Sequence, residues 1–357
     1  MGNSYQENLK NSVIELYPAY LKKSILRQCV SEGLVINNKK NNRQIAITLD
    51  DIVDVTELDT IEEKINKILD EKSVLEFIDE FEFKKQYRHF CYFKCKNITV
   101  EKIQNLVKNG DIKFFKRDEI SSPNDRYQKP VLHVVDNLFY FKFSSTLNND
   151  VGKRINFSMV CVIDLEKKIC EFRFDRIGIA YKNSFDFYKV EISKIQHYLI
   201  EKLEISFENI DFKAIIDYIK DKENISIYAQ RLQRNGTTAY LEAYADDENG
   251  VIPILGELSN FIEGNNQLFS LDENTKRIKS ELEKFIKEIE VKSDIPMVKV
   301  RMDDERIRFG ITHDYKGTNY SLFMFYGELL GDKEMMDYVR NYLIECNREL
   351  EELIPAE

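Results

Sequence analysis

Apolar positions recur at helical spacing near the start of the chain. In residues 6–32 the series is interrupted at Tyr17-Pro18, where proline suits the first position of a second helix, and its apolar members are Leu9, Val13, Leu16, Leu21, Ile25, Leu26 and Val30. Thr60 and Glu63 form a capping box before the next amphipathic run, which predicts a helix over 60–71. Thr99 similarly predicts the start of a helix that ends at Gly110.

From residue 131 onward, strands of alternating apolar and polar residues come in pairs. The predicted hairpins turn at Asp136-Asn137, around Glu166-Lys167 and at Asn235-Gly236, and Asn-Gly is a strong signal for a tight two-residue turn. A fourth hairpin joins 297–302 to 306–312. Further strands are predicted at 44–49, 86–96, 111–116 and 319–326, and helices at 186–203, 210–221, 251–263, 272–290 and 332–353.

Hairpins that alternate with helices favour an α+β fold, with antiparallel β-hairpins and sheets flanked by amphipathic helices. A chain of 357 residues exceeds one average domain. The turn-rich stretch Ser121–Asp125 therefore predicts a boundary between a helical or mixed domain, 1–125, and an acidic α+β domain, 126–357.

Charge is unevenly distributed along the chain. The net charge is −10, yet residues 1–130 hold 22 Lys and Arg against 21 Asp and Glu. Within the segment 81–117, ten cations face three acids and aromatic residues lie between them, a composition typical of surfaces that bind phosphates and stack bases. The predicted nucleic-acid-binding residues are Lys84, Lys85, Arg88, Lys94, Lys96, Lys113, Lys116 and Arg117. An ordinary solvated face with core aromatics explains the same pattern.

The hairpin 297–312 predicts a second charged site. If Asp304-Glu305 form its turn, Arg301 lies directly opposite Arg308. Like charges in opposition destabilise a sheet unless negative charge compensates them. The compensating negative charge comes either from the acids of the turn or from a bound anion. Lys299, Arg301 and Arg308 are therefore the predicted anion-binding residues.

Familiar catalytic and nucleotide-binding motifs are missing from the sequence. It contains no P-loop, no Gly-x-Gly-x-x-Gly, no Gly-x-Ser-x-Gly and no His-Glu-x-x-His, so no cofactor is predicted. His89, Cys91 and Cys95 share one face of a predicted strand, but a structural zinc needs four ligands and no second pair is evident, so no metal is predicted. Glu80, Glu82 and Lys84 have the spacing of a metal-dependent nuclease, but no upstream Asp partner is placed by a strand.

The remaining composition favours a cytoplasmic protein. The six cysteines are scattered through apolar stretches, as expected of reduced core thiols, and neither a secretory h-region nor a long apolar span is seen, so no membrane association is expected. The abundance of Lys, Asn and Ile suits an AT-rich bacterial genome.

The leading functional hypothesis is a non-enzymatic binding or regulatory protein that presents charged surfaces to a macromolecular partner, either protein or nucleic acid, and that also forms a homo-oligomer. One alternative is a nucleic-acid-binding component or a divergent Mg²⁺-dependent nuclease, in a bacterial defence or mobile-element system. Another is a sensor of a small anionic ligand held by Arg301 and Arg308.

Overall fold

The structure is a computed structural model that describes residues 2–37, 52–117, 129–220, 222, 225–243, 255–302, 307–327 and 333–353. The chain divides into two compact units. Unit 1 comprises Met1–Ile210 with Glu328–Asn341, and unit 2 comprises Asp211–Gly327 with Tyr342–Glu357. Each unit is described by itself.

The predicted α+β class is confirmed. Unit 1 contains the helices α1 (Gly2–Leu16), α2 (Ala19–Ser31), α4 (Ile61–Ile68), α5 (Lys72–Lys84), α6 (Val100–Lys108), α7 (Phe187–Leu203) and the start of α12 (Glu334–Leu353). Its strands are β1 (Val35–Ile36), β2 (Val53–Asp54), β3 (His89–Lys96), β4 (Lys113–Phe114), β5 (Val131–Val135), β6 (Leu138–Asn148), β7 (Arg154–Asp164), β8 (Ile169–Phe174) and β9 (Ser206–Glu208).

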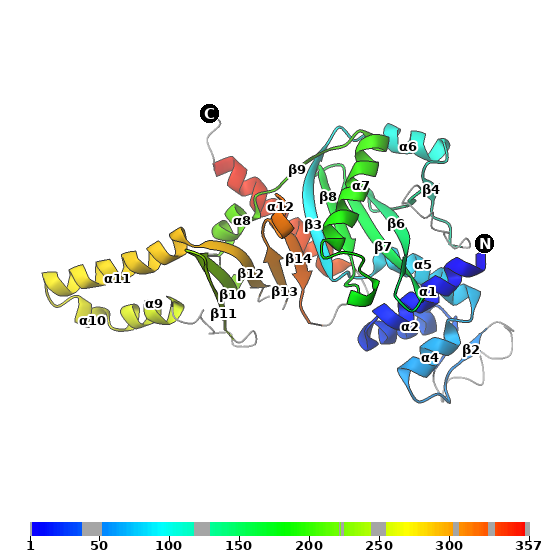
Figure 1. Cartoon of the computed structure of the whole chain (residues 1–357), viewed down its shortest axis with the longest axis horizontal. Helices are drawn as coiled ribbons and strands as arrows, with labels where there is room; N and C mark the ends of the chain where they lie inside the picture. Colours follow the sequence, from blue (N-terminus) through cyan, green and yellow to red (C-terminus); the bar gives the residue numbers. More distant parts are fainter. Residues whose placement is uncertain are drawn as a thin grey trace. The chain divides into compact units, whose positions relative to one another are not determined.

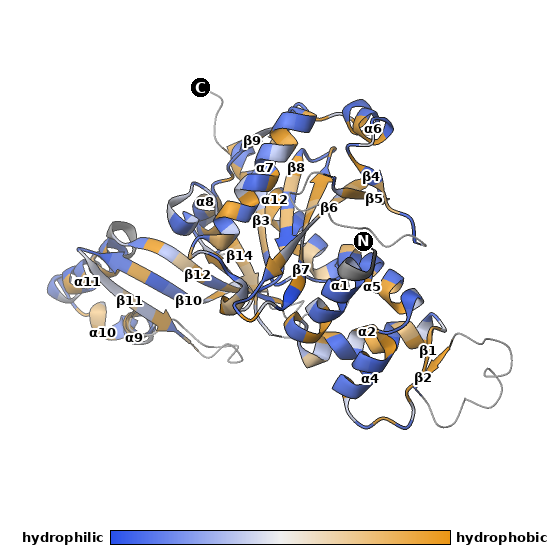
Figure 2. Ribbon diagram, turned by 45° about the vertical axis from the view of Figure 1, so that its right-hand side comes forward, coloured by the Kyte–Doolittle hydropathy of each residue, from blue (hydrophilic) through white to orange (hydrophobic). Residues whose placement is uncertain are grey.

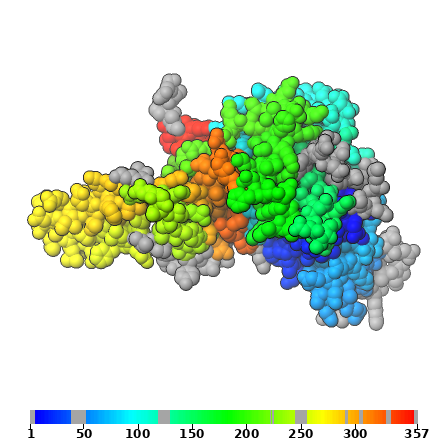
Figure 3. Space-filling view, in the orientation of Figure 1, coloured from blue at the N-terminus to red at the C-terminus, as the bar shows by residue number. Residues whose placement is uncertain are grey.

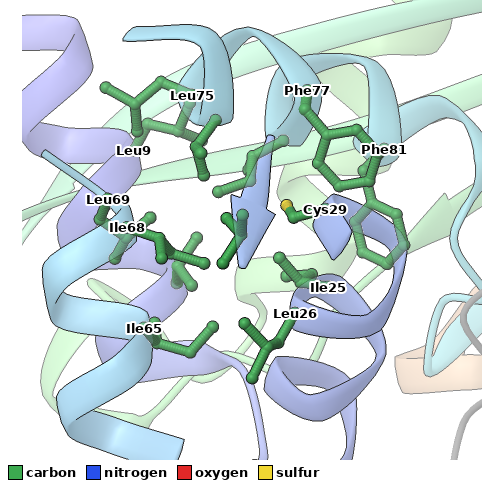
Figure 4. Close-up of a cluster of buried hydrophobic side chains, with 14 of the residues drawn as sticks. Leu9, Ile25, Leu26, Cys29, Ile65, Ile68, Leu69, Leu75, Phe77 and Phe81 are labelled. Atoms are coloured by element: carbon green, nitrogen blue, oxygen red, sulfur yellow. The ribbon is translucent and has the colours of Figure 1, made fainter. Parts of the chain in front are cut away.

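The first helices of unit 1 build a core of their own. Apolar side chains of α1, α2, α4 and α5 meet in one cluster, in which Leu9, Ile25, Ile65 and Phe77 are all buried (Figure 4). Thr60 and Glu63 form the predicted capping box at the start of α4. Most of the periodic apolar residues are therefore buried where the sequence predicts an inward face, although Val30 at the end of the series is 38% exposed.

The sheet of unit 1 has the strand order β3-β8-β7-β6-β5-β4, with β9 also paired to β3. All of these pairs are antiparallel except β4 with β5. The two predicted hairpins, β5-β6 and β7-β8, are confirmed. Asp136 and Asn137 both have positive φ, as a tight two-residue turn requires.

One face of this sheet is apolar and packs against α7. Phe157 contacts Phe187, and Phe174 contacts Tyr188, with ring centroids 5.3 and 5.0 Å apart. Hydrophobic and hydrophilic residues alternate along α7 (Figure 2) because one side of the helix covers the sheet. His89 belongs to this face and contacts Tyr188, so the predicted strand face is packed core.

The other face of the same sheet carries charged and polar residues among apolar ones, and it is also covered. Lys142, Arg173 and Asn156 lie on it and bond to Asp79 of α5, Asp337 of α12 and Ser12 of α1. All three sheet residues are less than 5% exposed. Unit 1 therefore buries both faces of its main sheet.

Unit 2 contains a smaller antiparallel sheet and a helical arm (Figure 1). The strand order is β11-β10-β12-β13-β14, and the elements are β10 (Ile225–Arg234), β11 (Thr237–Glu242), β12 (Asp294–Met302), β13 (Ile307–Thr312), β14 (Leu322–Phe325), α8 (Phe212–Ile219), α9 (Leu255–Gly264), α10 (Asn266–Phe269) and α11 (Glu273–Lys292). The Asn235-Gly236 hairpin is confirmed, with φ of 49° and 75° at its two turn residues.

The arm consists of α9, α10 and α11. The chain runs out along α9, turns through α10 and returns along α11, so the two longer helices are antiparallel (Figure 1). The arm shares with β10 a small core made of Leu232, Leu255, Ile262 and Ile286. Leu258 and Leu282 pack against this core and are partly buried. The arm is shown in yellow in Figure 3.

One helix was not predicted from the sequence, and two predicted features lie outside the described residues. Helix α5 was not predicted, although its apolar residues at helical spacing are buried. The predicted strand 44–49 and the boundary at Ser121–Asp125 lie outside the described residues. Strands β4 and β5, on either side of that boundary, pair within unit 1, and the division into 1–125 and 126–357 stays a prediction.

Candidate functional site

The predicted basic segment is extensively paired with acids from other parts of unit 1. Lys84 pairs with Glu80, which also forms an ion pair with Arg117. Lys96 bonds to Glu208, with 2.6 Å between Nζ and Oε1. The local excess of positive charge in the sequence is therefore largely compensated once the chain folds.

Lys85 does not lie on a surface at all. Its side chain is 1% exposed, and its ammonium group contacts Glu82 at 3.1 Å and Asp175 at 2.5 Å. Burial alone would lower the pKa of Lys85, but the two carboxylates raise it above the usual lysine value. Lys85 therefore neutralises buried acids, and a phosphate cannot reach it in this structure.

The other predicted cations are spread over different elements. Arg88 donates to the Tyr20 hydroxyl at 2.8 Å and is half-buried, as is Lys94 on β3. Lys113 and Lys116 are exposed at and beyond β4. The structure does not gather these four residues into one cluster, and their role in nucleic-acid binding stays a prediction.

The predicted anion site of unit 2 has the predicted register. Arg301 of β12 is the direct partner of Arg308 on β13, and Lys299 is the partner of Gly310. These residues lie on one face of the sheet, because paired residues and those two apart along a strand point the same way. The opposite face carries the buried pair Val300 and Phe309. Three cations thus lie along two neighbouring strands.

Lys299 lies in an aromatic cage with one carboxylate. Its Nζ is 2.5 Å from Glu242 Oε1, and it lies 4.8 Å from the ring centroid of Tyr326 and 5.5 Å from that of Tyr240. Gly310 makes room for this arrangement, since a Cβ at that position would lie 2.7 Å from the Tyr326 hydroxyl oxygen. Lys299 is therefore already neutralised by Glu242.

Arg301 and Arg308 differ in exposure. Arg301 is 8% exposed and Arg308 is half-buried. The acids of the turn, including Asp303, lie outside the described residues. Both explanations of the arginine pair, a local acid and an anionic ligand, therefore remain open as proposals.

A second set of charges in unit 1 was not anticipated from the sequence. Arg173 Nη2 bonds to Glu171 at 2.7 Å and to Asp337 at 2.6 Å, and Arg340 lies 3.4 Å from Glu171. Glu171, Arg173 and Arg340 are each less than 5% exposed. The sequence contains a pattern that could have indicated this cluster, because Glu171 and Arg173 alternate with apolar residues along β8. Such alternation, however, normally predicts a polar face in contact with solvent.

The loose nuclease spacing does not form a site. Glu80 and Glu82 lie on a helix, where residues two apart do not face each other. Glu82 is buried and bonded to Tyr17 and Lys85. Among the described residues, no group of three or more His, Cys, Asp or Glu is placed to hold a metal ion.

The arm of unit 2 exposes large apolar side chains that sequence reasoning did not single out. Phe261 of α9 is 59% exposed, and Ile278 and Phe285 of α11 are 52% and 57% exposed. Leu268 and Leu271, near the turn between the helices, are 59% and 73% exposed. This density of exposed apolar residues within 25 positions is typical of interaction surfaces.

We infer that the three helical residues lie on the same side of the arm, because Ile262 and Ile286 belong to one core that the two helices share. Phe261 and Phe285 each precede an inward residue, Ile262 or Ile286, and are therefore rotated by about 100° from it in the same sense. In an antiparallel helix pair, equal rotations from the shared core lead to the same side. Ile278 is seven positions from Phe285 and so points nearly the same way.

The chain matches no protein-family model, and no curated protein matches it. No helix among the described residues is both long and apolar enough to cross a membrane.

Proposed function

We propose that this protein is a non-enzymatic binding protein that holds a protein partner on the arm of unit 2. The observation that carries the proposal is the exposure of Phe261, Ile278 and Phe285 on the two longer helices of the arm. These residues continue outward from a small core, so a partner that covers them extends that core. The proposed mode is the docking of an amphipathic helix.

The charges beside these residues indicate the chemistry of the partner. Glu257 is four positions before Phe261, while Glu281 and Glu288 are four before and three after Phe285. Residues three or four apart are neighbours on a helix surface, so carboxylates border the apolar side chains. We therefore propose a partner segment with an apolar face bordered by lysine or arginine.

A binding experiment with a model peptide tests this proposal. A labelled amphipathic peptide of Leu and Lys is titrated with the full-length protein, and a Leu and Glu peptide of the same pattern serves as the charge control. We expect Ile278→Ser with Phe285→Ser to weaken binding of the Leu and Lys peptide by about tenfold, the equivalent of roughly 1.4 kcal/mol.

The matched control is Phe185→Ser in unit 1, because Phe185 is 87% exposed and lies outside the arm. It should leave binding unchanged. Equal binding of the two peptides, or equal loss in the arm and control variants, would overturn the proposal.

The confirmed register supports a second candidate function, the binding of an anionic ligand beside Arg301 and Arg308. Two guanidinium groups on directly opposed residues concentrate positive charge, and guanidinium groups pair well with phosphate or carboxylate oxygens. The same face carries Tyr240 and Tyr326, onto which bases of single-stranded nucleic acid can stack.

Thermal unfolding with inorganic phosphate and with single-stranded oligonucleotides, across a salt series, tests this second candidate. Binding should raise the unfolding temperature, and Arg301→Gln with Arg308→Gln should abolish the rise, while Arg348→Gln on α12 should not. An oligonucleotide response without a phosphate response indicates a nucleic-acid partner, and cleavage in Mg²⁺ indicates a nuclease. No response to either probe refutes the site.

A further inference from the structure

The outer strand β11 of unit 2 has unusual properties for a sheet edge. It pairs with β10 on one side, and no other described strand pairs with it. Thr237, Thr238, Ala239 and Tyr240 are all exposed. Edge strands usually carry Lys or Pro, which discourage pairing with another chain, but residues 237–242 contain neither.

The hairpin geometry determines which backbone groups of β11 point outward. The two-residue turn makes Arg234 and Thr237 the pair that exchanges both hydrogen bonds, so alternate residues from Thr237 onward bond to β10. The bond from Ala243 N to Tyr228 O, 2.8 Å long, continues that alternation. The backbone N–H and C=O groups of Thr238, Tyr240 and Glu242 therefore point away from β10.

These three outward residues are complementary to themselves under a twofold axis. Antiparallel pairing requires outward residues to oppose outward residues. The register that uses all three places Thr238 opposite Glu242 of the second strand and Tyr240 on the axis. No like charges oppose each other in this register, and Tyr240, which is 44% exposed, opposes the same residue of the partner.

We propose that a second copy of this chain pairs with β11 through this register and forms a homodimer with a continuous sheet. A twofold axis gives a closed, isologous contact, in which the same patch serves both copies. This inference does not depend on the arm, because the pairing uses backbone groups of β11. A foreign peptide strand is the other possible occupant of such an edge.

Cysteine cross-linking in the full chain tests the proposal. Paired residues that exchange hydrogen bonds have Cα atoms about 5.5 Å apart, within the range that a disulfide spans. Tyr240→Cys should therefore yield a covalent dimer under mild oxidation. Thr237→Cys is the control, because in this register residue 237 lies opposite residue 243 of the second copy and its two copies are far apart. The six native cysteines are buried, so background cross-linking should be low.

Light scattering over a concentration series supplies an independent measure. Wild type should convert from monomer to dimer, and Tyr240→Lys should raise the midpoint concentration by about tenfold or more, because it removes the aromatic pair and opposes two charges. Tyr240→Phe should leave the midpoint nearly unchanged, and circular dichroism checks that each variant folds. A wild-type monomer at all concentrations, or equal cross-linking of both cysteine variants, would overturn the proposal.

Discussion

Strands in both units alternate between apolar and polar residues, but the two units differ in how fully they cover the two faces of their sheets. In unit 1, helices cover the apolar face and also the face that carries charged residues, so Lys142, Glu171 and Arg173 are buried. In unit 2, Arg308 and Tyr240 remain partly exposed on the polar face, and the arm leaves apolar side chains in water. Alternation thus identifies the two faces of a strand, whereas the packing of other elements decides which of them meets solvent.

The energetic consequence is that unit 1 depends on charge pairing. A buried ion costs several kcal/mol unless its partner is present, whereas an exposed pair contributes little. Variants that remove one charge from a buried pair or from an exposed pair therefore measure how strongly burial affects the contribution of a pair to the unfolding free energy.

The largest effect is expected for Lys142→Met. Lys142 and Asp79 are both about 1% exposed and their charged atoms are 2.6 Å apart, so the variant leaves a buried carboxylate without its cation. We expect the free energy of unfolding to fall by about 3–5 kcal/mol in urea denaturation. Adding Asp79→Leu should restore much of the loss. A loss under about 1 kcal/mol would mean that this face is not sealed from water.

The next effect concerns His313, a buried histidine of unit 2 whose Nδ1 lies 3.0 Å from Ser321 Oγ. Burial lowers its pKa to about 4, with Lys213 adding to the shift and with Asp211, Asp294 and Asp314 opposing it. Since the unfolded chain has a pKa near 6.5, the unfolded state binds the proton first as the pH falls.

Stability from His313 is therefore complete above pH 6.5 and decreases between pH 6.5 and pH 4, by about 3 kcal/mol in total. His313→Gln should flatten this part of the pH profile relative to wild type, as measured by denaturation at each pH. If the stability of wild type and of His313→Gln changed equally with pH, water would reach the histidine in the folded protein.

A smaller effect is expected for Gly310→Ala. The new methyl group would contact the Tyr326 ring, and such overpacking costs about 1–3 kcal/mol. Tyr326→Ala in the same chain should relieve the clash, so the two changes should not be additive. Additive losses in thermal unfolding would contradict the close packing around Lys299.

The smallest effect is expected for Lys84→Ala. Lys84 is 50% exposed and pairs with Glu80 on the same helix, so the unfolding free energy should change by less than about 0.5 kcal/mol. Compared with Lys142→Met, it measures how much burial matters for the same residue type. A loss above 2 kcal/mol would show that the basic segment has a structural role.

The sequence alone determined the local structure of this protein. Capping at Thr60, the tight turn at Asn235-Gly236 and the pairing of Arg301 with Arg308 depend on residues close in the chain, and all three are confirmed. Helix α5 was not predicted because no side-chain cap marks its start, unlike Thr60 at the start of α4.

The tertiary structure alone decided which charged and apolar residues are available to a partner. Lys85 is buried in contact with Asp175, which is 90 positions away in the sequence and neutralises its charge. Phe285 is exposed because the short arm has too little of the chain around it to cover every apolar residue. Burial depends on contacts between distant segments, so neither local composition nor periodicity contains that information.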